Sequence, residues 1–165
     1  MQTQKTGEQA MKVLRDFAVK LGAEFSLNAD LVVEKADRYF LLNKRLQSIS
    51  HWDFYYAGTY LGKVKKGTFF PSFNLLAMLA KGKANKIVVD RKAAWLFICG
   101  RDVFRRSILT MHGLRRKGDY ALVMNEFGEC LGFGKILCSL DADVKGVEVV
   151  VKNISDVGDF LRREI

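Results

Sequence analysis

The chain has 165 residues, of which 49% are hydrophobic and 27% are charged, a composition typical of a globular protein with one large or two small domains. Its 27 Lys and Arg against 18 Asp and Glu give a formal net charge of +9, which favours polyanionic partners, either nucleic acid or an anionic membrane surface. No apolar run is long enough to span a membrane, and none lies at the N-terminus as in a signal peptide. We therefore expect a soluble cytoplasmic protein that does not bind a membrane.

The first half of the chain predicts a helix, several strands and a second helix. Thr6 and Gln9 have the spacing of a capping box, and the apolar residues after them recur on one helical face until Gly22. The elements expected next are a strand pair, a short helix, a bent strand, a further strand and a helix capped by Ser72: residues 31–34, 38–42, 43–50, 53–64, 68–70 and 73–80. We therefore expect residues 1–83 to form a small α/β domain with antiparallel strands.

The short polar stretch at residues 81–85 is the best candidate for a domain boundary, and the pattern changes after it. A strand and a short apolar helix closed by Gly100 come first. Further strands and a last helix are expected at residues 107–111, 120–124, 131–138, 147–151 and 156–163. This order predicts a small mixed barrel over residues 84–165, so the chain as a whole is of the α+β class.

The residue types of an enzyme or a metal site do not fall into the patterns that such sites need. His51 and His112 lie in different predicted domains, and neither is part of a zinc-binding motif. Gly132 and Gly134 form a GxG pair, but a strand runs through them and the next glycine of a dinucleotide-binding loop is missing. We therefore expect no catalytic site, no metal and no cofactor.

Three cysteines, Cys99, Cys130 and Cys138, are widely spaced within apolar runs. We interpret each as a small buried hydrophobic residue and not as half of a disulfide bond.

No acidic residue occurs between Asp102 and Asp119, whereas five basic residues do, at positions 105, 106 and 115–117. Arginine binds phosphate in a bidentate manner and stacks on bases, so this concentration favours an RNA-binding face. The alternative is a set of solvated charges that do not converge. The candidate RNA-binding residues are Arg91, Lys92, Arg101, Arg105, Arg106, Lys135, Lys145 and Lys152.

Aromatic residues gather in the first half of the chain. Trp52, Phe54, Tyr55, Tyr56 and Tyr60 could serve as a platform on which bases stack. Such a run more often packs into a core, and we favour the core for these residues and for the tryptophan at position 95.

The segment 131–135, with its GxG pair after the polar turn at 124–129, resembles the late hairpin of a PUA domain, and 96–103 resembles that fold's helix-to-strand segment. Together with residues 58–63 and 156–162, these segments occur in the order found in the ribosome-biogenesis PUA family of nuclear import protein seven (Nip-seven). The resemblance covers nearly the whole chain and is closer to archaeal than to eukaryotic members.

This resemblance implies an N-terminal α/β domain, followed by a C-terminal PUA pseudo-barrel that binds single-stranded, uridine-rich RNA during large-subunit pre-ribosomal RNA maturation. It also implies that the protein is not an enzyme, and that its partners include the exosome and the Shwachman-Bodian-Diamond-type assembly protein. Archaeal members carry basic RNA contacts near the last strand, where this chain has Lys152 as its single basic residue between positions 147 and 155. The prediction therefore shifts to Arg101, Arg105 and Arg106, supported by Lys135, Lys145 and Lys152.

Two other functions are compatible with the sequence. PUA domains are commonly appended to RNA-modifying enzymes, although residues 1–83 offer only isolated candidates such as His51 and Asp53. The aromatic N-terminal half could instead dock a protein partner.

Overall fold

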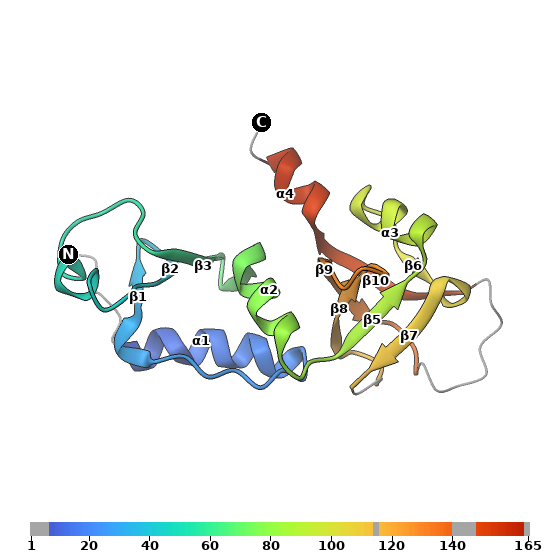
Figure 1. The fold of residues 1–165 in the computed structure, drawn as a ribbon, viewed down its shortest axis with the longest axis horizontal. Helices are drawn as coiled ribbons and strands as arrows, with labels where there is room; N and C mark the ends of the chain where they lie inside the picture. Colours follow the sequence, from blue (N-terminus) through green and yellow to red (C-terminus); the bar gives the residue numbers. More distant parts are fainter. Residues whose placement is uncertain (1–6, 114–115, 140–147, 164–165) are drawn as a thin grey trace. The chain divides into compact units, whose positions relative to one another are not determined.

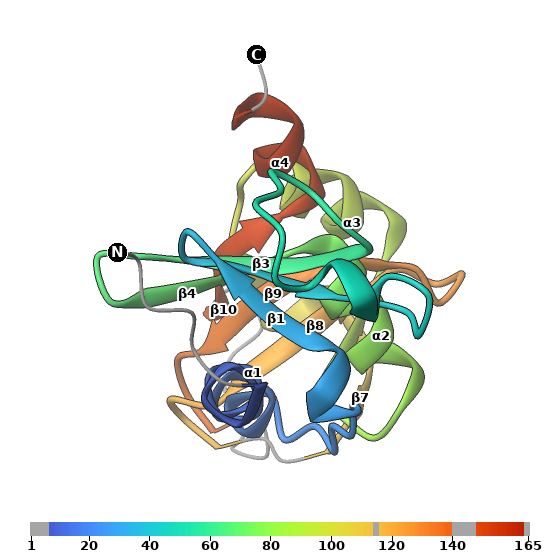
Figure 2. The same cartoon turned by 90° about the vertical axis from the view of Figure 1, so that its left-hand side faces the viewer.

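The computed structural model describes residues 7–113, 116–139 and 148–163, and its chain divides into two compact units (Figures 1 and 2). One unit contains residues up to Val19 together with Phe25–Met78, and the other contains Lys20–Glu24 together with the chain from Leu79 onward. Each unit has its own β-sheet. The predicted boundary at residues 81–85 lies shortly after the chain enters the second unit.

The sheet of the first unit is an antiparallel meander in the order β1-β2-β3-β4. Its elements are α1 (Gly7–Lys20), η1 (Ala29–Leu31), β1 (Val32–Lys35), β2 (Arg38–Leu41), η2 (Gln47–Ile49), β3 (Thr59–Lys65), β4 (Thr68–Pro71) and α2 (Phe73–Lys81). The first and last predicted helices, the first strand pair and the antiparallel arrangement are confirmed. The short helix predicted at residues 43–50 is instead a turn followed by the 3-10 helix η2. The predicted capping box includes Thr6, which lies outside the described residues.

The two faces of this sheet are covered differently. On one face the ring of Phe69 contacts Tyr39 at 5.7 Å and Phe17 of α1 at 5.5 Å, both edge-on. On the other face Phe40 lies in a small buried cluster, against which Phe54 and Tyr60 pack. The connection from β2 to β3 therefore covers the face that lies opposite α1.

The bent strand predicted from residue 53 begins only at Thr59. Gly58, directly before it, has a φ of +67°, and a Cβ there would collide with the carbonyl of Leu41. A left-handed residue in close contact with a neighbouring backbone ends regular strand geometry, so residues 53–57 form part of a connection instead.

The start of α2 follows the prediction. The Ser72 hydroxyl accepts a hydrogen bond from the Leu75 N–H at 3.2 Å and donates one to the Tyr60 carbonyl at 2.6 Å. The cap therefore also fastens the helix to β3.

The second unit is a curled six-stranded sheet in the order β6-β10-β9-β8-β5-β7, in which β5 and β8 are parallel and all other neighbours are antiparallel. Its elements are β5 (Lys86–Val89), α3 (Arg91–Ile98), β6 (Val103–Phe104), η3 (Arg105–Ser107), β7 (Ile108–His112), β8 (Tyr120–Met124), β9 (Cys130–Ile136), β10 (Val149–Asp156) and α4 (Val157–Arg163). The predicted α+β class and mixed half-barrel are confirmed.

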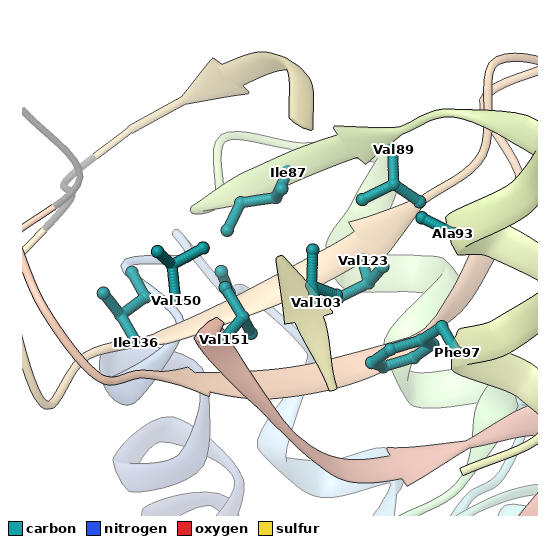
Figure 3. Packing of buried hydrophobic residues seen from close by; sticks show 10 residues of the cluster. Ile87, Val89, Ala93, Phe97, Val103, Val123, Ile136, Val150 and Val151 are labelled. Carbon is teal, nitrogen blue, oxygen red and sulfur yellow. The ribbon is translucent and has the colours of Figure 1, made fainter. Parts of the chain in front are cut away.

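The core of this unit lies between the curled sheet and α3 (Figure 3). Ala93 and Phe97 of α3 pack with Val123 of β8, Ile136 of β9 and Val151 of β10. These residues belong to four elements that are distant in sequence, so burial of their apolar surface holds the sheet and the helix together.

The GxG pair of β9 lies where β10 crosses it most closely. A Cβ on Gly134 would lie 2.6 Å from the Lys152 carbonyl oxygen, and one on Gly132 would collide with the Ser155 carbonyl. The backbones of β9 and β10 therefore approach each other closely at these two glycines.

Hydrogen bonds fix the end of α3 to β10 and α4. The Asn153 side-chain amide donates to the Phe97 carbonyl at 2.8 Å and to the Asp156 carboxylate at 3.1 Å. Arg162 of α4 donates to the Ile98 carbonyl at 3.1 Å, and Asp156 accepts the Asp159 N–H at 2.7 Å. The carbonyls at the end of α3 thus find side-chain donors from two other elements.

The cysteine prediction is correct on pairing and partly wrong on burial. All three thiols are free, but Cys99 is exposed at the end of α3, while Cys130 and Cys138 are half-buried. Cys99 follows the last helical turn, so the apolar run that contains it does not place it in the core.

Candidate nucleic-acid interface

The start of α3 presents two cations to solvent. Asp90 caps the helix by accepting the Ala93 N–H at 2.8 Å, which places Arg91 and Lys92, both exposed, in the first turn. The free N–H groups and the dipole of a helix N-terminus add to the positive potential of these side chains.

Two arginines from η3 lie close to this helix start. The Asp90 N–H donates to the Ser107 carbonyl at 3.0 Å, and β5 pairs with β7 up to Val89 and Ile108. The segment that contains Arg105 and Arg106 is therefore held beside the residue that precedes Arg91. Arg106 is exposed, and its guanidinium lies 5.8 Å from the centre of the Phe104 ring.

Trp95 lies one helical turn after Arg91 and is 65% exposed, so the prediction of a core position is wrong. Ala93 and Phe97 fill the core from the other side of α3. An eight-residue helix on a sheet buries only one stripe, and the continuous apolar sequence around Trp95 hides which stripe that is. We call Arg91, Lys92, Trp95, Arg105 and Arg106 the basic surface.

The remaining predicted cations are not part of this surface. Lys135 and Lys152 are exposed Cα partners on β9 and β10. They alternate with Ile136 and Val151, whose side chains enter the core, so the lysines lie on the opposite face of these strands from α3.

Arg101 is exposed and lies beyond the C-terminal end of α3. The eight residues of this helix span about 12 Å along its axis, which separates Arg101 from Arg91 at the other end. Lys145 lies outside the described residues. The structure therefore brings together four of the eight predicted cations.

The aromatic run of the first unit is not wholly a core. Phe54 and Tyr60 are half-buried and pack against the core cluster, which agrees in part with the predicted core position. Trp52, Tyr55 and Tyr56 are 61%, 78% and 59% exposed, so the prediction is wrong for these three. Adjacent side chains cannot all face the same side of an extended chain, and this could have warned against a core position for three aromatics at positions 54–56.

A hollow of about 550 Å³ in the second unit contains His112. Among the described residues, its wall includes the lysines at positions 83 and 86, but no carboxylate or thiol. The Lys86 ammonium donates to the Gly82 carbonyl at 2.8 Å, and Lys83 pairs with Glu24 at 3.6 Å. Both lysines thus have partners within the unit.

Within residues 7–113, 116–139 and 148–163, no group of three or more His, Cys, Asp and Glu side chains is placed to hold a metal ion. Nor does any helix in these ranges combine the length and apolar character needed to cross a membrane.

Comparisons with known proteins agree with this architecture. The family model described as the UPF0113 PUA domain matches residues 85–165. A UPF0113 protein of Archaeoglobus fulgidus is 27% identical over 133 residues, which cover 79% of this chain and 75% of that protein.

Solved structures show the same fold over nearly the whole chain. A hypothetical protein of Pyrococcus horikoshii has a TM-score of 0.66 at 18% identity, with 98% of each chain covered. A conserved PUA domain protein of Thermoplasma acidophilum has a TM-score of 0.64 at 18% identity, with 98% of this chain and 99% of that chain covered. Residues 85–165 are thus similar to the UPF0113 PUA domain, and the chain shares its fold with archaeal PUA proteins.

Proposed function

We propose that this protein is a non-enzymatic RNA-binding factor that acts in maturation of large-subunit pre-ribosomal RNA. The observation that carries the proposal is the basic surface of the PUA domain, where four cations and an exposed tryptophan gather around the start of α3. Such a surface combines phosphate-binding and base-stacking groups, which unpaired RNA engages at the same time.

The mechanism begins with electrostatic capture. Arg91, Lys92, Arg105 and Arg106 neutralise phosphates and release condensed counterions. Trp95 then stacks on an unpaired base beside the Arg91 side chain. These contacts favour single-stranded RNA, because stacked and paired bases in a duplex do not offer a free face.

The finer features of the role follow from the resemblance to the Nip-seven family. They are a preference for uridine-rich RNA, a cytoplasmic place of action, and partners that include the exosome and the Shwachman-Bodian-Diamond-type assembly protein. Copurification of large-subunit precursor RNA with the tagged protein from cells tests this role.

The RNA-binding test compares two variants that each lose two positive charges. In Arg105→Ala/Arg106→Ala, we expect affinity for a single-stranded uridine-rich oligonucleotide to fall at least tenfold in a fluorescence-anisotropy titration. In Arg116→Ala/Lys117→Ala, the same charge is lost from exposed residues before β8, and we expect a much smaller effect. Equal affinities for the two variants would exclude the basic surface as the RNA site.

Incubation of the full-length protein with labelled S-adenosylmethionine and RNA tests the alternative of an RNA-modifying enzyme. We expect no label in the RNA, and transfer of the methyl group would replace the proposal.

A further inference from the structure

A row of cations crosses the sheet of the first unit, on the face opposite α1. Strand register places Lys35 of β1 beside Arg38 of β2, and Arg38 beside Lys63 of β3. Directly opposed residues on neighbouring strands project from the same face, so the three side chains form a line across the sheet. Lys65 lies on the same face, two residues further along β3.

The connection between β2 and β3 brings aromatic rings to this row. The Arg38 guanidinium lies 4.4 Å from the centre of the Tyr55 ring, and the Lys35 ammonium lies 5.4 Å from the centre of the Phe54 ring. Tyr56 rests edge-on against the buried Phe40 at 5.4 Å. The buried cluster that contains Phe40 on this face of the sheet therefore supports the aromatic rings of the connection.

Tyr55 is the most exposed of these rings. One face of the ring carries the Arg38 guanidinium, and the side chain is nevertheless 78% exposed. A cation–π contact of this kind fixes the ring and the guanidinium at a small cost in conformational entropy. The other face of the ring is thus available as a pre-arranged stacking surface.

The local charge is positive. The exposed acidic residues nearest in sequence are Asp37 in the β1–β2 turn and Asp53 in the connection. The sheet face carries four cations, at positions 35, 38, 63 and 65, which outnumber these two carboxylates. The surface therefore attracts an anionic ligand.

We propose that Lys35, Arg38, Tyr55, Tyr56 and Lys63, which we call the aromatic–cationic surface, form a second binding site for single-stranded nucleic acid. A base stacks on the open face of Tyr55, while phosphates on either side contact the row of cations. A strand of nucleic acid supplies flat π-faces and regularly repeated negative charge together, which are the two features that this surface complements. This site is separate from the basic surface of the PUA domain and uses none of its residues.

The two tryptophans of the chain provide a reporter for each unit. Trp52 lies three residues before Tyr55 and is exposed, whereas Trp95 belongs to the basic surface. In the full-length Trp95→Phe protein, only Trp52 fluoresces as tryptophan. We expect addition of a single-stranded oligouridylate to quench this fluorescence in a saturable manner.

Substitutions in the same Trp95→Phe protein separate stacking from charge. We expect Tyr55→Ala to weaken the binding that Trp52 reports about tenfold, the loss typical for one stacked base. Tyr55→Phe keeps the ring and should bind almost as well. Arg38→Lys keeps the charge but loses the planar guanidinium, so we expect an intermediate loss.

The matched control is Arg15→Gln, because Arg15 is an exposed cation of α1, which packs on the other face of the sheet. We expect this variant to retain the affinity that Trp52 reports. Unchanged quenching of Trp52 in Tyr55→Ala would overturn the proposal, and so would an equal loss of quenching in Tyr55→Ala and Arg15→Gln. The aromatic–cationic surface would then be assigned to a protein partner.

Failure of this site can be told apart from failure of the basic surface. Arg105→Ala/Arg106→Ala should abolish quenching of Trp95 in a Trp52→Phe protein and preserve quenching of Trp52 in the Trp95→Phe protein. Loss of both signals in this double variant would show that Trp52 responds only to RNA bound at the PUA domain, which contradicts a second site. The second site would be supported if Tyr55→Ala removed the quenching of Trp52 in the Trp95→Phe protein and left the quenching of Trp95 in the Trp52→Phe protein unchanged.

Discussion

Asp156 is a carboxylate only 2% exposed at the end of β10, and it is surrounded by donors from three residues. Its oxygens accept the side-chain amide of Asn153, the backbone N–H of Asp159 and, at 3.4 Å, the guanidinium of Arg162. A buried carboxylate persists only when it is paired in this way. The residue thus determines where β10 ends and where the last helix begins.

Asp156→Ala removes the acceptor and leaves these donors unsatisfied. We expect a loss of about 3 kcal/mol in the free energy of unfolding, in line with charged hydrogen bonds to buried groups. Urea unfolding measures this, with Glu126→Ala at an exposed turn position as the control. Equal stability of the two variants would contradict a structural role for the carboxylate.

Cys130 gives a test at the level of a single thiol. Burial raises the pKa of Cys130, although a backbone hydrogen bond from Gly132 and the charge of Lys86 act in the opposite direction. A raised pKa means less thiolate at pH 8, and the thiolate is the reactive form. We expect iodoacetamide to modify the exposed Cys99 well before Cys130, with the rate at Cys130 rising as the pH approaches 10; mass spectrometry of peptides follows both sites.

At the scale of elements, α3 owes its position to the residue before it. The Asp90 side chain caps the helix, and its N–H reaches the carbonyl of Ser107, so one residue orders both segments of the basic surface. The contact with Ser107 depends on the pairing of β5 with β7. Local patterns therefore identify the cations but not which of them meet.

Asp90→Ala should lower the free energy of unfolding by about 1 kcal/mol, the usual value for a lost helix cap. Asp90→Asn keeps an acceptor and should restore most of it. Thermal unfolding followed by circular dichroism compares the two, and a full loss in Asp90→Asn would show that charge, not the hydrogen bond, holds the helix.

Elements with local signals are the ones that the sequence predicts well. The cap at Ser72 and the periodicity of α1 both follow from neighbouring residues. The two-residue β6 has no such signal, and β10 extends to Asp156 through an irregular register that no alternation reveals. Exposure of Trp95 and Tyr55 depends on which stripe or face the rest of the fold covers.

At the scale of the whole molecule, the net charge of +9 is divided among separate surfaces. Four cations lie at the basic surface, and the four of the first sheet, at positions 35, 38, 63 and 65, lie in another unit. The predicted convergence of all cations on one face required long-range geometry, which composition does not contain.

The salt dependence of RNA binding reports how many of these cations contact phosphate. For binding at the basic surface alone, four phosphate contacts give a slope of about −3 for the logarithm of the association constant against that of the salt concentration. Titrations of Trp95 fluorescence in the Trp52→Phe protein measure this slope. A slope near zero would contradict an electrostatic mode of capture.

The segment Lys20–Glu24 has a consequence for any attempt to divide the protein. Although it lies early in the chain, it belongs to the second unit, where the Leu21 carbonyl accepts the Asn85 N–H at 2.7 Å and the Glu24 N–H reaches the Lys83 carbonyl. A fragment that starts at residue 84 would keep every strand of the PUA domain and lose the acceptor for a residue that is almost fully buried. The smallest independent piece of this domain is therefore discontinuous in sequence, and a domain exchange between relatives must carry these five early residues along with the C-terminal half.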